Sequence, residues 1–97
     1  GARLRLDPRP ASKPEGETML SWFDRAVSLL ATARHAGNVE AVAFAEDARA
    51  HFIEASALRR TVYVDARAAR AGLRLAQREH RKGVRAFRQA ERLLGAA

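Results

Sequence analysis

Side chains that could perform acid–base or metal chemistry are few in this sequence and stand far apart. The three histidines, His35, His51 and His80, are separated along the chain, and no serine has the companion pattern of a hydroxyl nucleophile. Cysteine is absent, which removes thiolate nucleophiles, disulfides and cysteine-bound zinc, and there is no glycine-rich phosphate loop. We therefore predict no catalytic residue, no metal site and no cofactor, and we expect a protein that is not an enzyme.

One histidine does have carboxylates at helical spacing. Asp47, His51 and Glu54 are four and three residues apart, which places them on one face of a helix. A di-iron bundle would add paired Glu-x-x-His motifs, and none occurs. We interpret these three residues as a surface ladder of ion pairs, and His80 as a packed side chain on an apolar helix face.

Arginines near the C-terminus form the most regular pattern in the chain. Successive members are three or four residues apart, so they draw a stripe along one side of a helix. The stripe consists of Arg67, Arg70, Arg74, Arg78, Arg81, Arg85, Arg88 and Arg92. Three interpretations remain open: a solvated face whose side-chain stems cover apolar neighbours, a charge pattern that matches an acidic strip on another helix, or a surface that contacts the phosphates of a polyanion.

The charge is concentrated in the same region. The formal net charge is +7 in 97 residues. Residues 1–58 carry seven basic and eight acidic groups, a net of −1, whereas residues 59–97 carry eleven basic and three acidic groups, a net of +8. Glu40, Asp47 and Glu54 recur every seven residues, so the earlier segment offers an acidic strip of its own.

Apolar periodicity predicts that helices position these side chains. The first helix should run from about residue 17 to residue 36, with Gly37 in a left-handed conformation and Asn38 as the N-cap of the next helix. Residues 37–38 are therefore the expected turn. The apolar stripe of the first helix consists of Leu20, Phe23, Val27 and Leu30, widened by Met19, Trp22 and Ala26.

A second apolar stripe begins after Asn38 and continues to about residue 94. Its members are Val42, Ala45, Ala48, Phe52, Ala55, Val62, Ala66, Ala69, Leu73, Ala76, Val84, Phe87, Ala90 and Leu94. Either one helix spans 39–94, or it breaks near the Thr61–Val64 run into two. Because that run contains no glycine or proline, we favour a continuous or bent helix, about 80 Å long. Such a helix would extend beyond the first one and would need a second chain to cover it.

The fold class expected from these elements is all-α. It is either an antiparallel helical hairpin with a long second helix, bent or broken, or a three-helix bundle. Residues 17–97 should form a single helical domain. Residues 1–16, which contain three prolines, should form a flexible arm, although Ser12 and Glu15 have the spacing of a helix start.

The sequence also bears on location. No apolar run approaches the roughly 18–20 residues that a membrane span needs, and the first residues are too polar for a signal peptide. With the lack of cysteine, this favours a cytoplasmic protein. Because the chain begins with Gly, we expect it to be part of a longer protein.

A segment of the chain resembles helical adaptor modules. The run ATARHAGNVEAVAFAEDARAHF looks like the helix–turn–helix of tetratricopeptide-type or microtubule-interacting-and-trafficking modules, with Gly37, Ala41, Ala48 and Phe52 at the matching positions. The likeness covers about a quarter of the chain and lacks the tetratricopeptide period and closing proline. We treat it as an analogy and not as family membership.

These observations favour a non-catalytic module for protein–protein interaction, an adaptor or assembly unit that binds a protein partner or forms a homodimer. The first helix should pack on the segment from Val42 to Phe52. The expected partner-binding residues are Val62, Leu73, Val84, Phe87 and Leu94, together with the eight arginines of the stripe. The alternative is that the same stripe binds DNA or RNA through the backbone, because few aromatic residues accompany it for base stacking.

Overall fold

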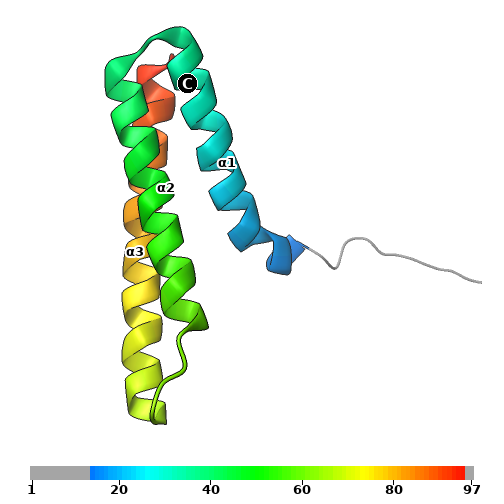
Figure 1. Ribbon diagram of the computed structural model, residues 1–97, viewed down its shortest axis with the longest axis vertical. Coiled ribbons are helices and arrows are strands. Elements are labelled where there is room, and N and C mark those ends of the chain that lie inside the picture. Colours follow the sequence, from blue (N-terminus) through cyan, green and yellow to red (C-terminus); the bar gives the residue numbers. More distant parts are fainter. Residues whose placement is uncertain (1–13, 96–97) are drawn as a thin grey trace, which may run out of the picture.

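The computed structural model describes the backbone of residues 14–95 and the side chains of residues 22–95. This part of the chain folds into three α-helices without a strand: α1 (Pro14–Ala36), α2 (Val39–Arg60) and α3 (Ala66–Leu93) (Figure 1). The expected all-α class is confirmed, in its three-helix form. None of the helices in this range is both long enough and apolar enough to cross a membrane.

The first helix begins earlier than the periodicity indicates. It starts at Pro14 and not at residue 17, since proline is well suited to the first helical turn, where its missing N–H is not needed. Residues 14–16 of the expected arm are therefore helical. The rest of that arm, including the expected cap at Ser12, lies outside the described residues.

The turn between α1 and α2 forms at the expected position. Gly37 has a φ of 68°, a left-handed conformation in which glycine has no steric penalty. Asn38 caps α2: its side-chain oxygen accepts a hydrogen bond from the Ala41 amide at 3.0 Å. The short turn makes α1 and α2 antiparallel neighbours.

The expectation of a continuous helix over 39–94 is wrong, because the chain leaves the helical conformation between Arg60 and Ala66. Thr61 is extended at the end of α2, and Asp65 is extended at the start of α3, where its carboxylate accepts a hydrogen bond from the Ala68 amide at 2.8 Å. Between them, the Tyr63 hydroxyl donates a hydrogen bond to the Leu58 carbonyl at 2.8 Å. β-Branched residues weaken the helix here, and the Asp65 cap starts a new one.

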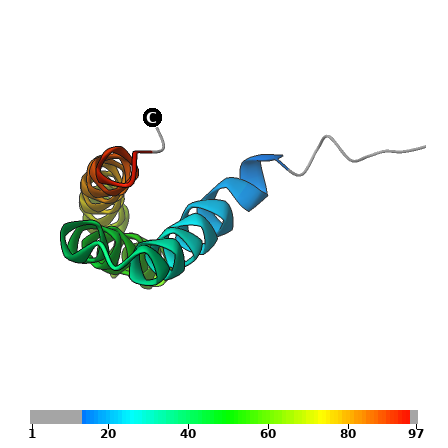
Figure 2. The same ribbon diagram turned by 90° about the horizontal axis from the view of Figure 1, so that it is seen from above.

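The three helices form an open arrangement with α2 at its centre. α2 and α3 run side by side along most of their length, while α1 packs on α2 and diverges from the pair toward its own start (Figure 1). Seen from above, α1 and α3 flank α2 and have little contact with each other (Figure 2). One side of α3 is therefore not covered by either of the other helices.

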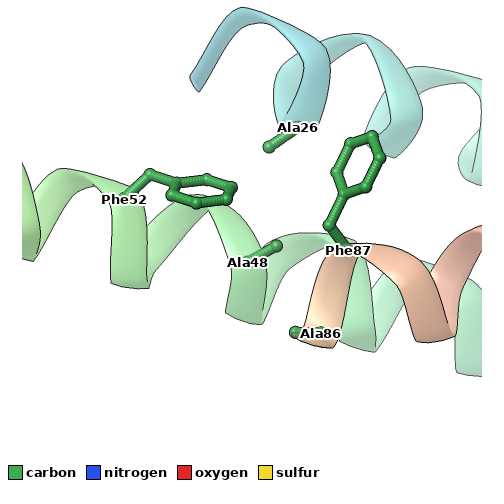
Figure 3. Close-up of a cluster of buried hydrophobic side chains, with 5 residues drawn as sticks. All are labelled: Ala26, Ala48, Phe52, Ala86 and Phe87. Carbon is green, nitrogen blue, oxygen red and sulfur yellow. The ribbon is translucent and has the colours of Figure 1, made fainter. Parts of the chain in front are cut away.

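The core lies where the three helices meet. Ala26 of α1, Ala48 and Phe52 of α2, and Ala86 and Phe87 of α3 form its largest buried cluster (Figure 3). A second cluster joins Leu30, Ala45 and Ala90 nearer the turn. Burying each phenylalanine stabilises the fold by roughly 1.5–3 kcal/mol, whereas each alanine contributes little area and instead lets the helices approach closely.

Glycine supplies part of the α2–α3 contact. A Cβ at Gly83 would lie 2.6 Å from Cε1 of Phe52, so the Phe52 ring packs directly on the backbone of α3. A Cβ at Gly72 would likewise collide with the ring of Tyr63, so that ring also packs directly on the backbone of α3. Both glycines are buried, although neither has a side chain that an apolar pattern would count.

The buried face of α3 consequently differs from the expected apolar stripe. Ala76, Phe87 and Ala90 are buried as expected, and Val84 packs against the main core cluster while half-buried. Gly72 and Gly83 are buried at the interface, whereas Leu73 is exposed. Val62, Ala66 and Ala69, which the expected stripe includes, are all exposed. The expected stripe runs through the break at 61–65, across which helical periodicity has no meaning.

The apolar stripe of α1 is buried only in part. Leu30 is buried and packs with Ala45, so α1 does dock on the Val42–Phe52 segment as expected. Val27, however, is 40% exposed and lies outside the core. The side chain of Leu20 falls outside the part of the chain whose side chains are described.

Candidate functional site

All eight arginines of the expected stripe lie on α3, and every one of them is exposed. The buried residues of α3, from Gly72 to Ala90, recur on the helix at positions roughly half a turn away. The arginines therefore point away from α2. We call this set the arginine face; it consists of Arg67, Arg70, Arg74, Arg78, Arg81, Arg85, Arg88 and Arg92.

Within residues 22–95, no side chain neutralises the arginine face. The ion pairs in that range involve other basic residues, namely Arg34, His51 and Lys82. None of the eight arginines has a hydrogen-bond or ion-pair partner there. Like charges at three- and four-residue spacing repel one another along a helix, so a bound anion would relieve that repulsion.

A shallow groove on the arginine face brings four guanidinium groups close to one apolar side chain. It has a volume of about 380 Å³ and is lined by Arg81, Val84, Arg85, Arg88 and Arg92. Val84 is half-buried. Each guanidinium carries five N–H donors in a planar fork that matches the oxygens of carboxylates and phosphates. This groove is the part of the arginine face best formed to hold an anionic group.

A second groove lies between α2 and α3 and has a different character. Its volume is about 400 Å³, and its lining consists of Phe44, Asp47, His51, Lys82, Arg85, Ala86 and Gln89. Its lining carries the acidic group of Asp47 and the basic groups of Lys82 and Arg85 beside His51. Asp47 pairs with His51 and Lys82 pairs with Glu79, so this groove offers less uncompensated charge than the arginine face.

His51 forms the main polar link between α2 and α3. Its Nδ1 lies 2.7 Å from a carboxylate oxygen of Glu79, and its Nε2 lies 3.4 Å from Asp47. The hydrogen bond from His51, aided by Lys82, lowers the pKa of Glu79. The ladder expected from the sequence correctly pairs His51 with Asp47 but includes Glu54 and misses Glu79, which approaches from another helix. In the described chain, no group of three His, Asp or Glu side chains could hold a metal ion.

An aromatic cluster holds α1 against the α2–α3 pair. The Trp22 ring lies 5.7 Å from the Phe52 ring, 5.3 Å from the Phe87 ring and 6.0 Å from the His80 ring, centroid to centroid. The guanidinium of Arg25 lies over Trp22, 4.4 Å from the ring centroid. These contacts make the cluster part of the core.

His80 is the titratable member of this cluster. Its Nδ1 is buried and lacks a hydrogen-bond partner among the described residues. Burial lowers the pKa of His80, and the positive charge of Arg59 lowers it further, because both disfavour the imidazolium. The expectation of a packed histidine on an apolar face agrees with these contacts.

The five apolar residues expected to bind a partner do not form one surface. Phe87 is only 4% exposed and belongs to the core, and Val84 and Leu94 are half-buried. Leu73 is 48% exposed, and Val62, in the segment between α2 and α3, is 94% exposed. The helix break explains the difference, because it lets α3 fold back so that α2 covers much of the apolar stripe.

Some exposed apolar side chains were not expected. Val64 is 92% exposed, and Ile53 and Leu75 are about half exposed. Val64 lies in the same segment as Val62, so two almost fully exposed valines lie between α2 and α3. The sequence indicated that a helix begins directly after them, since Asp65 is a good helix N-cap.

Comparison with known proteins gave no match: no family model matches the chain, and none was found among the curated proteins or the solved structures. A proposal for the function therefore rests on the described geometry.

Proposed function

We propose that this chain is a non-catalytic helical interaction module that binds an anionic partner through the arginine face of α3. The observation that carries the proposal is the set of eight exposed arginines without an acidic partner among the described side chains. A row of this kind attracts anionic surfaces at long range and holds them by charge-assisted hydrogen bonds.

The position of the apolar residues supports this choice of surface. A homodimer built on the apolar stripe would need Phe87 and its neighbours to be free, but Phe87 packs against Trp22 inside the chain. The arginine face has no such competing contact. Binding through this face leaves the core intact, so an interaction and the fold do not compete for the same side chains.

The residue type supports the same proposal. All eight positions are arginine, and none is lysine. Arginine remains charged at any physiological pH and presents a planar fork of donors, whereas lysine presents a compact and strongly hydrated charge.

The test compares two variants of equal net charge. The face variant replaces Arg81, Arg85 and Arg88 by Gln, and the control variant replaces Arg34, Arg49 and Arg60, which lie on α1 and α2, by Gln. Each lowers the formal net charge from +7 to +4. Glutamine has a helix propensity close to that of arginine, so both variants should fold.

The measurement is the salt concentration that elutes each full-length protein from immobilised heparin, a polyanion. We expect the face variant to elute at clearly lower salt than the control variant, because it loses three contacts to heparin, whereas the control loses the same net charge and the exposed Arg34–Glu46 ion pair. Circular dichroism verifies that both remain helical. Equal elution of the two variants would show that binding follows net charge alone and would refute the arginine face as the binding surface.

A further inference from the structure

The length of the arginine face is close to one turn of a DNA double helix. From Arg67 to Arg92 the axial rise is about 37 Å at 1.5 Å per residue, and one turn of B-DNA is about 34–36 Å. A single rigid helix that lies along the duplex axis can therefore present positive charge to the phosphates over the length of one turn.

The composition of the arginine face indicates which kind of anionic partner fits. Binding sites for single strands place aromatic rings where bases can stack, but Trp22, Phe52 and Phe87 are turned into the core. Interfaces with proteins have an apolar centre surrounded by a polar rim. The only apolar side chain in the groove of the arginine face is Val84, which is half-buried. Contacts to a phosphate backbone need neither feature.

The open arrangement of the helices leaves room for a duplex. α1 packs mainly on α2 and meets α3 only at the aromatic cluster around Trp22 and Phe87, so α3 lies at one end of the three-helix arrangement (Figure 2). The arginines lie on the side of α3 opposite its buried residues and are exposed, and Arg85 also lines the groove between α2 and α3. The groove formed by Arg81, Arg85, Arg88 and Arg92 faces the same way and offers four guanidinium groups to neighbouring phosphates.

From these observations we infer that the anionic partner is double-stranded DNA, bound through its phosphate backbone with little regard to base sequence. The inference rests on the proposed function and names the partner of the same surface. α3 lies along the duplex, and the groove around Val84 makes the closest contacts. The acidic strip of Glu40, Asp47 and Glu54 lies on α2. The surface that meets the phosphate backbone of the DNA lies on α3.

The experiment titrates the full-length protein into fluorescent duplexes of about 20 base pairs, two helical turns, with two unrelated sequences. Fluorescence anisotropy gives the affinity at several salt concentrations. If four to eight arginines each contact a phosphate, the logarithm of the affinity should fall with the logarithm of salt with a slope of about −4 to −7. The two duplexes should bind with equal affinity, within about threefold.

The face variant and the control variant show whether these contacts come from the arginine face. The face variant should lose about three units of the salt slope and at least roughly tenfold in affinity at moderate salt. The control variant should keep the slope of the parent. If the slope is the same in all three proteins, the arginine face does not contact the DNA and the inference is wrong.

Two further probes separate failure of this inference from failure of the proposed function. If polyglutamate binds and its binding depends on Arg81, Arg85 and Arg88 while the duplex does not bind, the partner is an acidic polypeptide: the inference fails and the proposed function stands. If neither probe binds, both fail. A single strand of the same length that binds more tightly than the duplex would also overturn the inference, since it would require stacking that the arginine face does not provide.

Discussion

At the scale of single residues, the side chains with unusual environments are structural, and His80 is the clearest case. It lies in the aromatic cluster between α1 and the α2–α3 pair, 6.0 Å from Trp22 and 5.4 Å from Phe52 by ring centroid. Its buried Nδ1 has no partner among the described residues. A charge placed there would be desolvated and repelled by the positive charge of Arg59, so the fold should resist protonation of His80.

This predicts that stability falls as the solution becomes acidic. The pKa of His80 is lowered below its usual value of 6.5 in the folded chain, so the unfolded chain binds the proton first. The free energy of unfolding should therefore be highest above pH 6.5 and decrease as the pH falls from about 7 to about 5. In His80→Phe, which keeps an aromatic ring, this decrease should be smaller.

Urea unfolding, followed by the fluorescence of Trp22, the single tryptophan, measures both proteins at each pH. The other histidines are common to the two proteins, so the difference between them isolates His80. Glu79 does not interfere at the upper end of this range, because its pKa is lowered from 4.5 and it stays ionised. Identical pH dependence in the two proteins would contradict the prediction.

At the scale of elements, the ends of the helices decide the architecture. Asn38 caps α2 through its side-chain oxygen, and its Nδ2 also donates a hydrogen bond to the Leu93 carbonyl at 3.1 Å. That single side chain joins the start of α2 to the end of α3, which are 55 residues apart in the chain. Asp65 has the simpler role of capping α3 alone.

The two roles of Asn38 can be separated by substitution. Asn38→Ala loses both hydrogen bonds and should lower the free energy of unfolding by about 1–2 kcal/mol. Asn38→Asp keeps the cap and loses the donor to Leu93. We expect its stability to lie between those of the parent and Asn38→Ala in chemical unfolding at neutral pH. If Asn38→Asp were as stable as the parent, the link to α3 would contribute nothing measurable.

At the scale of the whole molecule, the break between α2 and α3 determines where the apolar surface goes. A continuous helix would have left its apolar stripe open to a second chain. Folded back, α3 buries Ala76, Phe87 and Ala90 against the rest of the chain. Among the described residues, the outside then carries the arginine face on one side of α3, and exposed apolar side chains lie on all three helices and, as Val62 and Val64, in the segment between α2 and α3.

We therefore expect the chain alone to be a monomer. Light scattering should give a molar mass near 10.7 kDa at both physiological and high salt, because Phe52 and Phe87, the largest side chains of the second apolar stripe, are buried within the chain. A mass of twice that value at both salts would instead indicate that the exposed Val62, Val64 and Leu75 associate. Replacing these three by Ser would then be expected to restore the monomer.

Local features of this protein followed from the sequence by itself. The helical class, the turn at Gly37 and Asn38, the apolar face of α1 that includes Leu30 and the spacing of the eight arginines depend on backbone preference and on periodicity within one helix. These are properties of neighbouring residues, so they can be read without knowing which helices meet.

The tertiary structure alone decided what depends on contacts between helices. It packs α3 back along α2 after the break at residues 61–65, where the apolar pattern alone allowed one helix to continue. It also buries Gly72 and Gly83 under aromatic rings, which hydropathy does not register, and pairs His51 with Glu79 across two helices. The physical reason is the same in each case: partners distant in sequence select among conformations that local preferences leave nearly equal in free energy.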